Sequence, residues 1–246
     1  MCGRYAVTTD PAKLAAEIDA RNEVPADQVG PDYNVAPTTS VMTVVERHEP
    51  GHPDDDPALR VRAMRWGLVP SYTKVLGKGP LLFNARAETV LEKPAFRKSA
   101  AGGKRCLFPM DGWYEWKPGP VGPNGKPTKI PFYMSPKDGA RLFMGGLWAA
   151  WRSAEDRAAG DDTAWLSSAA IITTAAVGEH RAIHDRMPLV MPHEYWDTWL
   201  DPDTPLDPAL LAPPTEALAD AIEIREVAPL VNRVANNGPE LLEPVS

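Results

Sequence analysis

Short apolar and alternating segments, separated by turn-forming residues, run along most of the chain. Segments of about four to eight residues that are rich in β-branched and aromatic side chains predict strands. The predicted strands are residues 2–7, 40–46, 61–68, 105–109, 113–116, 130–134, 142–148 and 169–174. The 27 Pro and 18 Gly are spread along the chain, which fits many short strands and turns. Sheet is therefore expected to dominate the fold.

Fewer segments of the chain predict helices than predict strands. Asp10 can cap a first helix, Pro11 suits its first position, and Leu14 and Ile18 form an i, i+4 apolar pair that can dock it on a core. Further helix is predicted in residues 81–89, 193–200 and 215–222. Polar or Pro- and Gly-rich stretches, which predict loops, are residues 21–39, 47–58, 118–127 and 152–163. No internal repeat or clean boundary is visible, so residues 1–246 are expected to form a single domain.

Composition narrows the class of protein. No stretch approaches the roughly 18 consecutive apolar residues of a membrane helix. Two cysteines, Cys2 and Cys106, cannot form a disulfide framework or a metal knuckle. We therefore expect a soluble, cytoplasmic protein without a metal site and without a membrane partner.

Charge is unevenly distributed along the chain. The net charge is −7, yet residues 60–105 contain eleven Lys and Arg and only two Glu, so this stretch carries +9 and the remainder −16. A basic segment inside an acidic chain can form a local anion-binding face, because phosphate binding needs only a positive local field. A solvated basic surface remains the alternative.

Cys2 carries the most distinctive chemistry. Cysteine is small enough to permit removal of Met1, so we expect a mature chain that begins with an amine and a thiol on adjacent carbons. The reference pKa values of these groups are about 7.7–8.0 and about 8.5, so a fraction of each is nucleophilic at neutral pH. Such an aminothiol condenses with an aldehyde to an imine and then closes to a five-membered thiazolidine ring.

The alternative for Cys2 is inert packing, which is common for a buried cysteine. Its neighbours favour reactivity. On a strand, residues 2 and 4 point to the same face, so the guanidinium of Arg4 is expected beside the thiol. A nearby cation lowers a thiol pKa and also binds an anionic substrate.

Five segments at compatible spacings add a family resemblance. They are MCGRY at residues 1–5, YNVAP at 33–37, LFNARAET at 82–89, PMDGWYEW at 109–116 and IHDRMP at 183–188. With these five segments, the chain resembles the SRAP family of SOS-response-associated proteins. The resemblance runs from residue 2 to about residue 244. These proteins crosslink covalently to abasic sites in single-stranded DNA. The resemblance, with the strand pattern, implies an α+β fold on a largely antiparallel, barrel-like sheet with peripheral helices.

The resemblance assigns catalytic roles to four residues. Cys2 would capture the ring-opened sugar aldehyde of the abasic site through its amine and thiol. Glu115 would shuttle protons beside it, where aromatic neighbours can raise its pKa by desolvation. His184 would be a second acid-base group that acts in reversal or strand cleavage, and Asn84 would form a hydrogen bond near the sugar. The alternatives are an exposed strand charge for Glu115 and a helix cap for Asn84.

The resemblance also implies DNA contacts. The residues concerned are Arg4, Asn34, Pro37, Trp66, Tyr72, Arg86 and Arg186. The arginines would hold phosphates, Asn34 and Pro37 would border the DNA channel, and the two aromatic residues would stack on bases. Trp66 fits a core position equally well. The chain departs from the family pattern at Tyr72, where relatives carry Trp, and at Ala235, where a basic residue is common.

The implied partner is single-stranded DNA that contains abasic sites, with junctions between single and double strands left open as a second form. No cofactor is expected, and the protein is expected to be a monomer that is nucleoid-associated when crosslinked. Removal of its own Met1 and lyase activity are further implications.

The rival hypothesis is an amidohydrolase of the glutaminase type, which also begins Met-Cys-Gly and uses an N-terminal thiol. A DNA-binding relative without chemistry is a third hypothesis.

Overall fold

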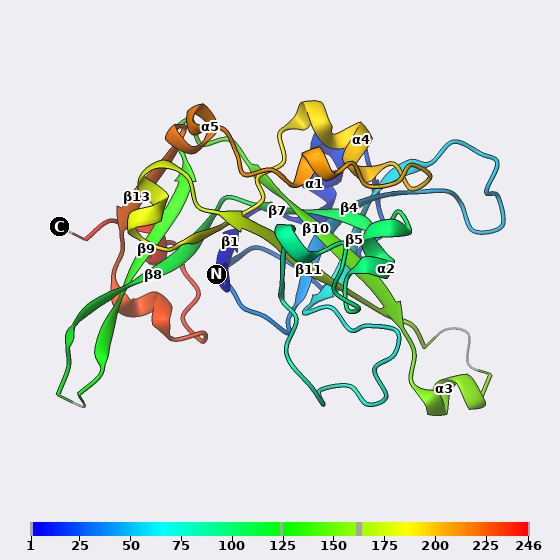
Figure 1. The fold of residues 1–246 in the computed structure, drawn as a ribbon, viewed down its shortest axis with the longest axis horizontal. Helices are drawn as coiled ribbons and strands as arrows, with labels where there is room; N and C mark the ends of the chain where they lie inside the picture. Colours follow the sequence, from blue (N-terminus) through cyan, green and yellow to red (C-terminus); the bar gives the residue numbers. More distant parts are fainter. Residues whose placement is uncertain (1, 124, 161–163, 246) are drawn as a thin grey trace.

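The strands form two sheets, seen in Figure 1. The structure, a computed structural model, describes residues 2–123, 125–160 and 164–245. The smaller sheet has the strand order β13-β9-β8-β1-β3. Its strands are β13 (Ile222–Glu226), β9 (Pro127–Pro136), β8 (Gly112–Val121), β1 (Tyr5–Val7) and β3 (Asp32–Val35). In Figure 1 the β8–β9 hairpin projects away from the rest of the molecule and β1 lies near the middle.

The larger sheet closes on itself into a barrel. Its order is β12-β11-β10-β7-β4-β5-β2, and a parallel pairing of β11 with β5 completes the ring. The strands are β12 (Arg186–Pro188), β11 (Leu166–Ala175), β10 (Leu142–Trp151), β7 (Arg105–Met110), β4 (Ser40–Arg47), β5 (Ala58–Trp66), β2 (Arg21–Asn22) and β6 (Asn84–Arg86), which joins β11. Most neighbouring pairs are antiparallel. The predicted fold class is thus confirmed.

The helices are short and peripheral. Asp10 caps α1, as predicted, by accepting a hydrogen bond from the Lys13 amide at 2.9 Å, and Thr215 caps α5 in the same way from the Leu218 amide at 3.2 Å. The α-helices are α1 (Pro11–Glu17), α2 (Arg97–Ala101), α3 (Ala154–Ala158), α4 (Trp196–Leu200) and α5 (Glu216–Asp220). The 3₁₀ turns are η1 (Ala87–Thr89), η2 (Gly178–Ala182), η3 (His193–Tyr195), η4 (Pro208–Leu211), η5 (Pro229–Asn232) and η6 (Pro239–Leu242). Among the described residues, none of the helices is long and apolar enough to cross a membrane.

Several local predictions were wrong. The first strand begins at Tyr5 rather than at residue 2, and the predicted connection 21–39 contains β2 and β3. The predicted helix after residue 83 is strand β6 followed by one 3₁₀ turn, because residues 84–86 pair with β11, far away in sequence. The predicted loop 152–163 contains α3, while its residues 161–163 lie outside the described part of the chain.

The two sheets share one hydrophobic core. Trp113 from the smaller sheet and Leu107 and Ile171 from the barrel are fully buried in the same cluster, which also contains Cys2. Arg105 is buried as well, and its guanidinium donates to the backbone carbonyls of Trp199 in the last turn of α4 and of Asp201 and Thr204 just beyond it. A cation at a helix C-terminus complements the helix dipole, so this buried charge is matched to its surroundings.

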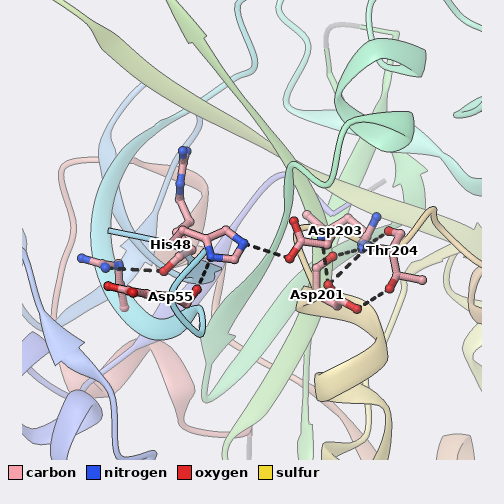
Figure 2. Close-up of polar contacts among 8 residues, drawn as sticks. His48, Asp55, Asp201, Asp203 and Thr204 are labelled. Carbon is pink, nitrogen blue, oxygen red and sulfur yellow. Dashed lines mark hydrogen bonds and ion pairs between the residues drawn. The ribbon is translucent and has the colours of Figure 1, made fainter. Parts of the chain in front are cut away.

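A histidine joins the β4–β5 hairpin loop to the loop after α4 (Figure 2). Nδ1 of His48 lies 2.6 Å from the backbone carbonyl of Asp55, and Nε2 lies 2.8 Å from Oδ2 of Asp203. A neutral imidazole can donate only one hydrogen bond, so the two oxygens favour the protonated ring. Both contacts raise the pKa of His48 above its usual 6.5, with the Asp55 carbonyl as the larger cause.

Candidate functional site

Strand β11 gathers candidate residues from distant parts of the chain. β6 pairs with it in parallel and places Asn84 and Arg86 beside it, while β12 pairs antiparallel and places Arg186 near the same end. Residues 169–172 of β11 are completely buried. Successive residues point to opposite faces, so both faces of β11 are packed here. A slip of one residue would exchange the side chains of the two packed faces, so this packing fixes the register and with it the positions of the three polar side chains.

Asn84 is attached directly to the start of the chain. Its Nδ2 donates a hydrogen bond to the backbone carbonyl of Cys2 at 2.8 Å. Its Oδ1 is buried and has no hydrogen-bond partner among the described residues. Since an unpaired buried acceptor costs about 1–3 kcal/mol, this oxygen is suited to accept a hydrogen bond from a group that enters the site.

The Cys2 thiol is fully buried. Burial, and next the negative charge of Glu115, raise its pKa well above the usual range, although the Arg4 amide donates to the sulfur and opposes the rise. The expectation that the Arg4 guanidinium lowers this pKa was wrong, because that guanidinium binds elsewhere. The thiol is therefore protonated at neutral pH, and its conversion to a thiolate requires a base.

Glu115 can serve as that base. It lies on β8 between the fully buried Tyr114 and the half-buried Trp116, and the glutamate itself is only 3% exposed. Desolvation raises the pKa of Glu115 from 4.5 to about 7. A group with this pKa is present in both protonation states at neutral pH, which is the condition for proton transfer in either direction. The predicted shift by desolvation is confirmed.

His184 lies in the turn between η2 and β12. Burial lowers its pKa below the usual 6.5, so the ring is neutral at pH 7. Its Nδ1 is 3.0 Å from the Arg186 amide and 2.8 Å from Oδ1 of Asp185. In the neutral ring Nδ1 can either accept from the amide or donate to the carboxylate, but not both. The Asp185 side chain is 85% exposed and can turn toward water, whereas the amide is fixed in the backbone, so Nδ1 accepts from the amide and the proton is on Nε2. The backbone of Arg186 thus sets the tautomer of His184.

The side chains of Arg4 and Asn34 bind each other and the backbone of residues 231–236, and we call this pair the bracket. Nη1 of Arg4 donates to Oδ1 of Asn34 at 2.6 Å and to the carbonyl of Val231 at 2.9 Å. Nδ2 of Asn34 donates to the carbonyls of Arg233 at 3.0 Å and Asn236 at 2.8 Å. Asn34 is 2% exposed, so it holds the chain in place and offers no free polar atom at the surface.

The three arginines assigned to phosphates differ in their surroundings. Arg186 forms a two-point ion pair with Glu88, at 2.5 and 2.9 Å, and also donates to the carbonyl of Thr173. Arg4 is half-buried in the bracket, whereas Arg86 is exposed beside β11. Arg86 is therefore the most accessible of the three to a phosphate in solution. Sequence reasoning missed Glu88, although it lies inside a quoted motif.

The two aromatic candidates also differ. Trp66 is completely buried, packs against Tyr5 at a ring distance of 5.1 Å, and donates from Nε1 to the carbonyl of Phe83 at 3.0 Å. It offers no face to a base, so the core alternative is correct for this residue. Tyr72 is 62% exposed and is available for stacking.

Pro37 is half-buried at the turn from β3 to β4 and precedes a strained residue. Thr38 has φ of 82°, an outlier for a β-branched residue, and its amide donates to the carbonyl of Trp66 at 2.7 Å. Sequence reasoning missed Thr38, because no residue type there signals a left-handed conformation. Within the described residues, no group of three or more His, Cys, Asp or Glu side chains is arranged to hold a metal ion.

Comparisons with known proteins agree on one family. The profile of the family described as SOS response associated peptidase (SRAP) matches residues 1–234. The abasic site processing protein YoqW of Bacillus subtilis is 34% identical over 99% of each chain, and YedK of Escherichia coli, which carries the same description, is 32% identical over 100% of each chain. Among solved structures, a Bacteroides thetaiotaomicron protein covers the whole chain with a TM-score of 0.79 at 22% identity. A phage-related protein of Bordetella bronchiseptica is 32% identical, covers 92% of this chain and 94% of its own, and has a TM-score of 0.62.

Proposed function

Because the chain belongs to the SOS response associated peptidase (SRAP) family, we propose that it processes abasic sites by crosslinking Cys2 to them in single-stranded DNA. The relatives' names supply the substrate. The observation that carries the proposal is that Asn84 and Glu115 both act on Cys2, one through a 2.8 Å hydrogen bond and the other through its charge. Removal of Met1, by the protein itself, exposes the amine that the reaction needs.

The crosslink forms in two stages. The amine of Cys2 adds to the aldehyde carbon of the ring-opened sugar, and the carbinolamine loses water to give an imine. The sulfur then adds to the imine carbon, the thiol proton moves to the nitrogen, and a thiazolidine ring closes. The aldehyde oxygen leaves as water, so no oxidant or reductant is consumed.

Glu115 supplies the proton movements in both stages. Its protonated form gives a proton to the departing hydroxyl, and its ionised form then accepts the proton of the thiol. Burial of Cys2 makes this second step necessary, because the thiol is not ionised at neutral pH. Assistance of this kind typically accelerates a reaction by about 10²–10⁴. The unpaired Oδ1 of Asn84 can accept a hydrogen bond from the amine or a sugar hydroxyl.

His184 acts later. As a neutral ring with its proton on Nε2 it can donate to an oxygen of the opened sugar, and this role fits release or strand cleavage rather than capture. Arg86 and Arg4 bind the phosphates on either side of the abasic position, and Arg186 joins them when a phosphate competes with Glu88. The amidohydrolase alternative is not favoured, because the relatives that match the whole chain are abasic site processing proteins.

The test is a denaturing gel with a labelled single strand that contains one abasic site. The wild-type protein should give a one-to-one adduct that survives denaturation, and Glu115→Gln should give it more slowly. Cys2→Ala should give no stable adduct, whereas Cys106→Ala, which removes the other buried thiol, should react like the wild type. An equal shift with Cys2→Ala would exclude the mechanism.

A further inference from the structure

An exposed tryptophan lies immediately before β11, outside the five segments that carry the family resemblance. Trp165 is 53% exposed, and the guanidinium of Arg152 lies over its ring at 4.9 Å. An exposed aromatic ring beside arginine is typical of sites that stack on nucleic-acid bases. Sequence reasoning missed it, because the residues before it are polar and read as a loop.

Trp165 borders a groove made of two neighbouring hollows. The first, of about 670 Å³, lies under the 67–82 loop, which projects below the barrel on the side of α3 in Figure 1. The second, of about 450 Å³, is lined by Trp165 and Arg62 among others. Both hollows are lined by Thr38 and Arg65, so they lie next to each other. We call this surface the Arg65 groove.

The loop over the first hollow is fixed in place. Nε1 of Trp151 donates to the carbonyl of Thr73 at 2.7 Å, and the amide of Val69 donates to Oγ of Ser168 at 2.9 Å. Both anchors come from barrel strands. The hollow is therefore supported by the barrel and does not depend on the loop alone.

The charge of the groove suits phosphates. Arg65, Lys74 and Lys78 line the first hollow, and none of the described residues that line it is acidic. In the second hollow Glu23 is engaged by Arg60 and Arg62, the latter at 3.3 Å. A concave surface with excess cations attracts a polyanion even on an acidic protein.

The groove leads away from the site along β11. Asn84 pairs with Ile171, and Trp165 lies six residues before that position. At about 3.3 Å per strand residue the separation is about 20 Å. Nucleotides in one strand of B-form DNA are spaced by roughly 3.4 Å, so about six of them, or fewer when extended, cover this distance.

We propose that the Arg65 groove binds the flank of the DNA single strand, with Trp165 stacked on a base about 20 Å from Asn84. The inference rests on the proposed function for the identity of the strand. A single strand is favoured over a duplex because stacking on a side chain requires an unpaired base. The cations of the first hollow then contact the phosphates between the abasic position and Trp165.

The experiment measures fluorescence anisotropy of a labelled oligothymidylate of about fifteen nucleotides without an abasic site. Trp165→Ala should weaken binding by about 5- to 150-fold, since stacking is worth roughly 1–3 kcal/mol per base. Trp165→Phe should retain most of the affinity. Tyr195→Ala, which removes another exposed ring (46% exposed), is the matched control and should bind like the wild type.

Equal affinity of Trp165→Ala and the wild type, or equal loss in Trp165→Phe and Trp165→Ala, would overturn the proposal. A short abasic strand that ends before Trp165 provides the second readout, because Trp165→Ala should still form its adduct at the wild-type rate if the variant is folded. Failure of the wild type to form any adduct would refute the proposed function, while the dependence of undamaged-strand binding on Trp165 would still be measured.

Discussion

Asn84 donates a hydrogen bond to the backbone carbonyl of Cys2 across 82 positions of sequence, at 2.8 Å. The bond joins the reactive end of the chain to strand β6, which β11 holds in register. The carbonyl belongs to the same residue as the amine and the thiol, so this contact holds the backbone of the residue that carries both. The start of the chain is thereby attached to the barrel.

Loss of this contact should slow the crosslink. Asn84→Asp keeps the shape of the side chain but replaces the donor by an acceptor, which cannot bind the carbonyl. A lost buried hydrogen bond costs about 1–3 kcal/mol, so we expect adduct formation to slow by roughly 5- to 150-fold in single-turnover assays. Asn22→Asp, at an exposed position, is the control. Equal rates for all three proteins would show that the contact has no role in the reaction.

The raised pKa of Glu115 predicts how stability depends on pH. The folded-state pKa of about 7 exceeds the ordinary 4.5, so the folded chain holds an extra proton between these values and loses stability as the pH rises through this interval. Glu115→Gln removes that loss. The variant should exceed the wild type by up to about 3 kcal/mol at pH 8 and match it near pH 4.5, measured by urea unfolding. Exposed Glu155, changed to Gln, should show no such pH-dependent difference.

His184 should affect the fate of the adduct more than its formation. Its ring is neutral and bonded through Nδ1 to the Arg186 amide, an arrangement suited to donation from Nε2. His184→Ala should form the adduct at close to the wild-type rate and change its release or the cleavage of the strand, followed over hours on denaturing gels. His52→Ala removes an imidazole that is 68% exposed and serves as control. A large loss in the rate of capture would place His184 in the first stage instead.

The bracket of Arg4 and Asn34 should contribute to stability. Asn34→Ala removes one acceptor and two donors from a position that is 2% exposed and leaves the carbonyls of Arg233 and Asn236 without these partners. We expect a loss of about 1–3 kcal/mol or more in the free energy of unfolding, measured in urea. Asn22→Ala should change it little. An unchanged value for Asn34→Ala would mean that the C-terminal segment is held by other contacts.

Local patterns predicted most strands and the capped helices, because alternation and capping residues act over a few positions. β6 could not be predicted from residues 84–86, since its conformation depends on pairing with β11. The orientation of Arg4 depends likewise on Asn34 and Val231, which come from other elements, so its hydrogen bonds could not be predicted from the neighbouring sequence. Glu115 was expected to be desolvated because its aromatic neighbours are adjacent in sequence. Trp165 has no such local signal, and its exposure becomes visible only in the folded chain.

The most direct test of the central claim is the intact mass of the adduct with an abasic single strand. Our account predicts the mass of the chain without Met1, plus that of the strand, minus one water. It also predicts that borohydride leaves this mass unchanged, because a thiazolidine has no imine to reduce. Retention of Met1 in the adduct, or a gain of two hydrogens on treatment with borohydride, would contradict the role assigned to the amine and thiol of Cys2.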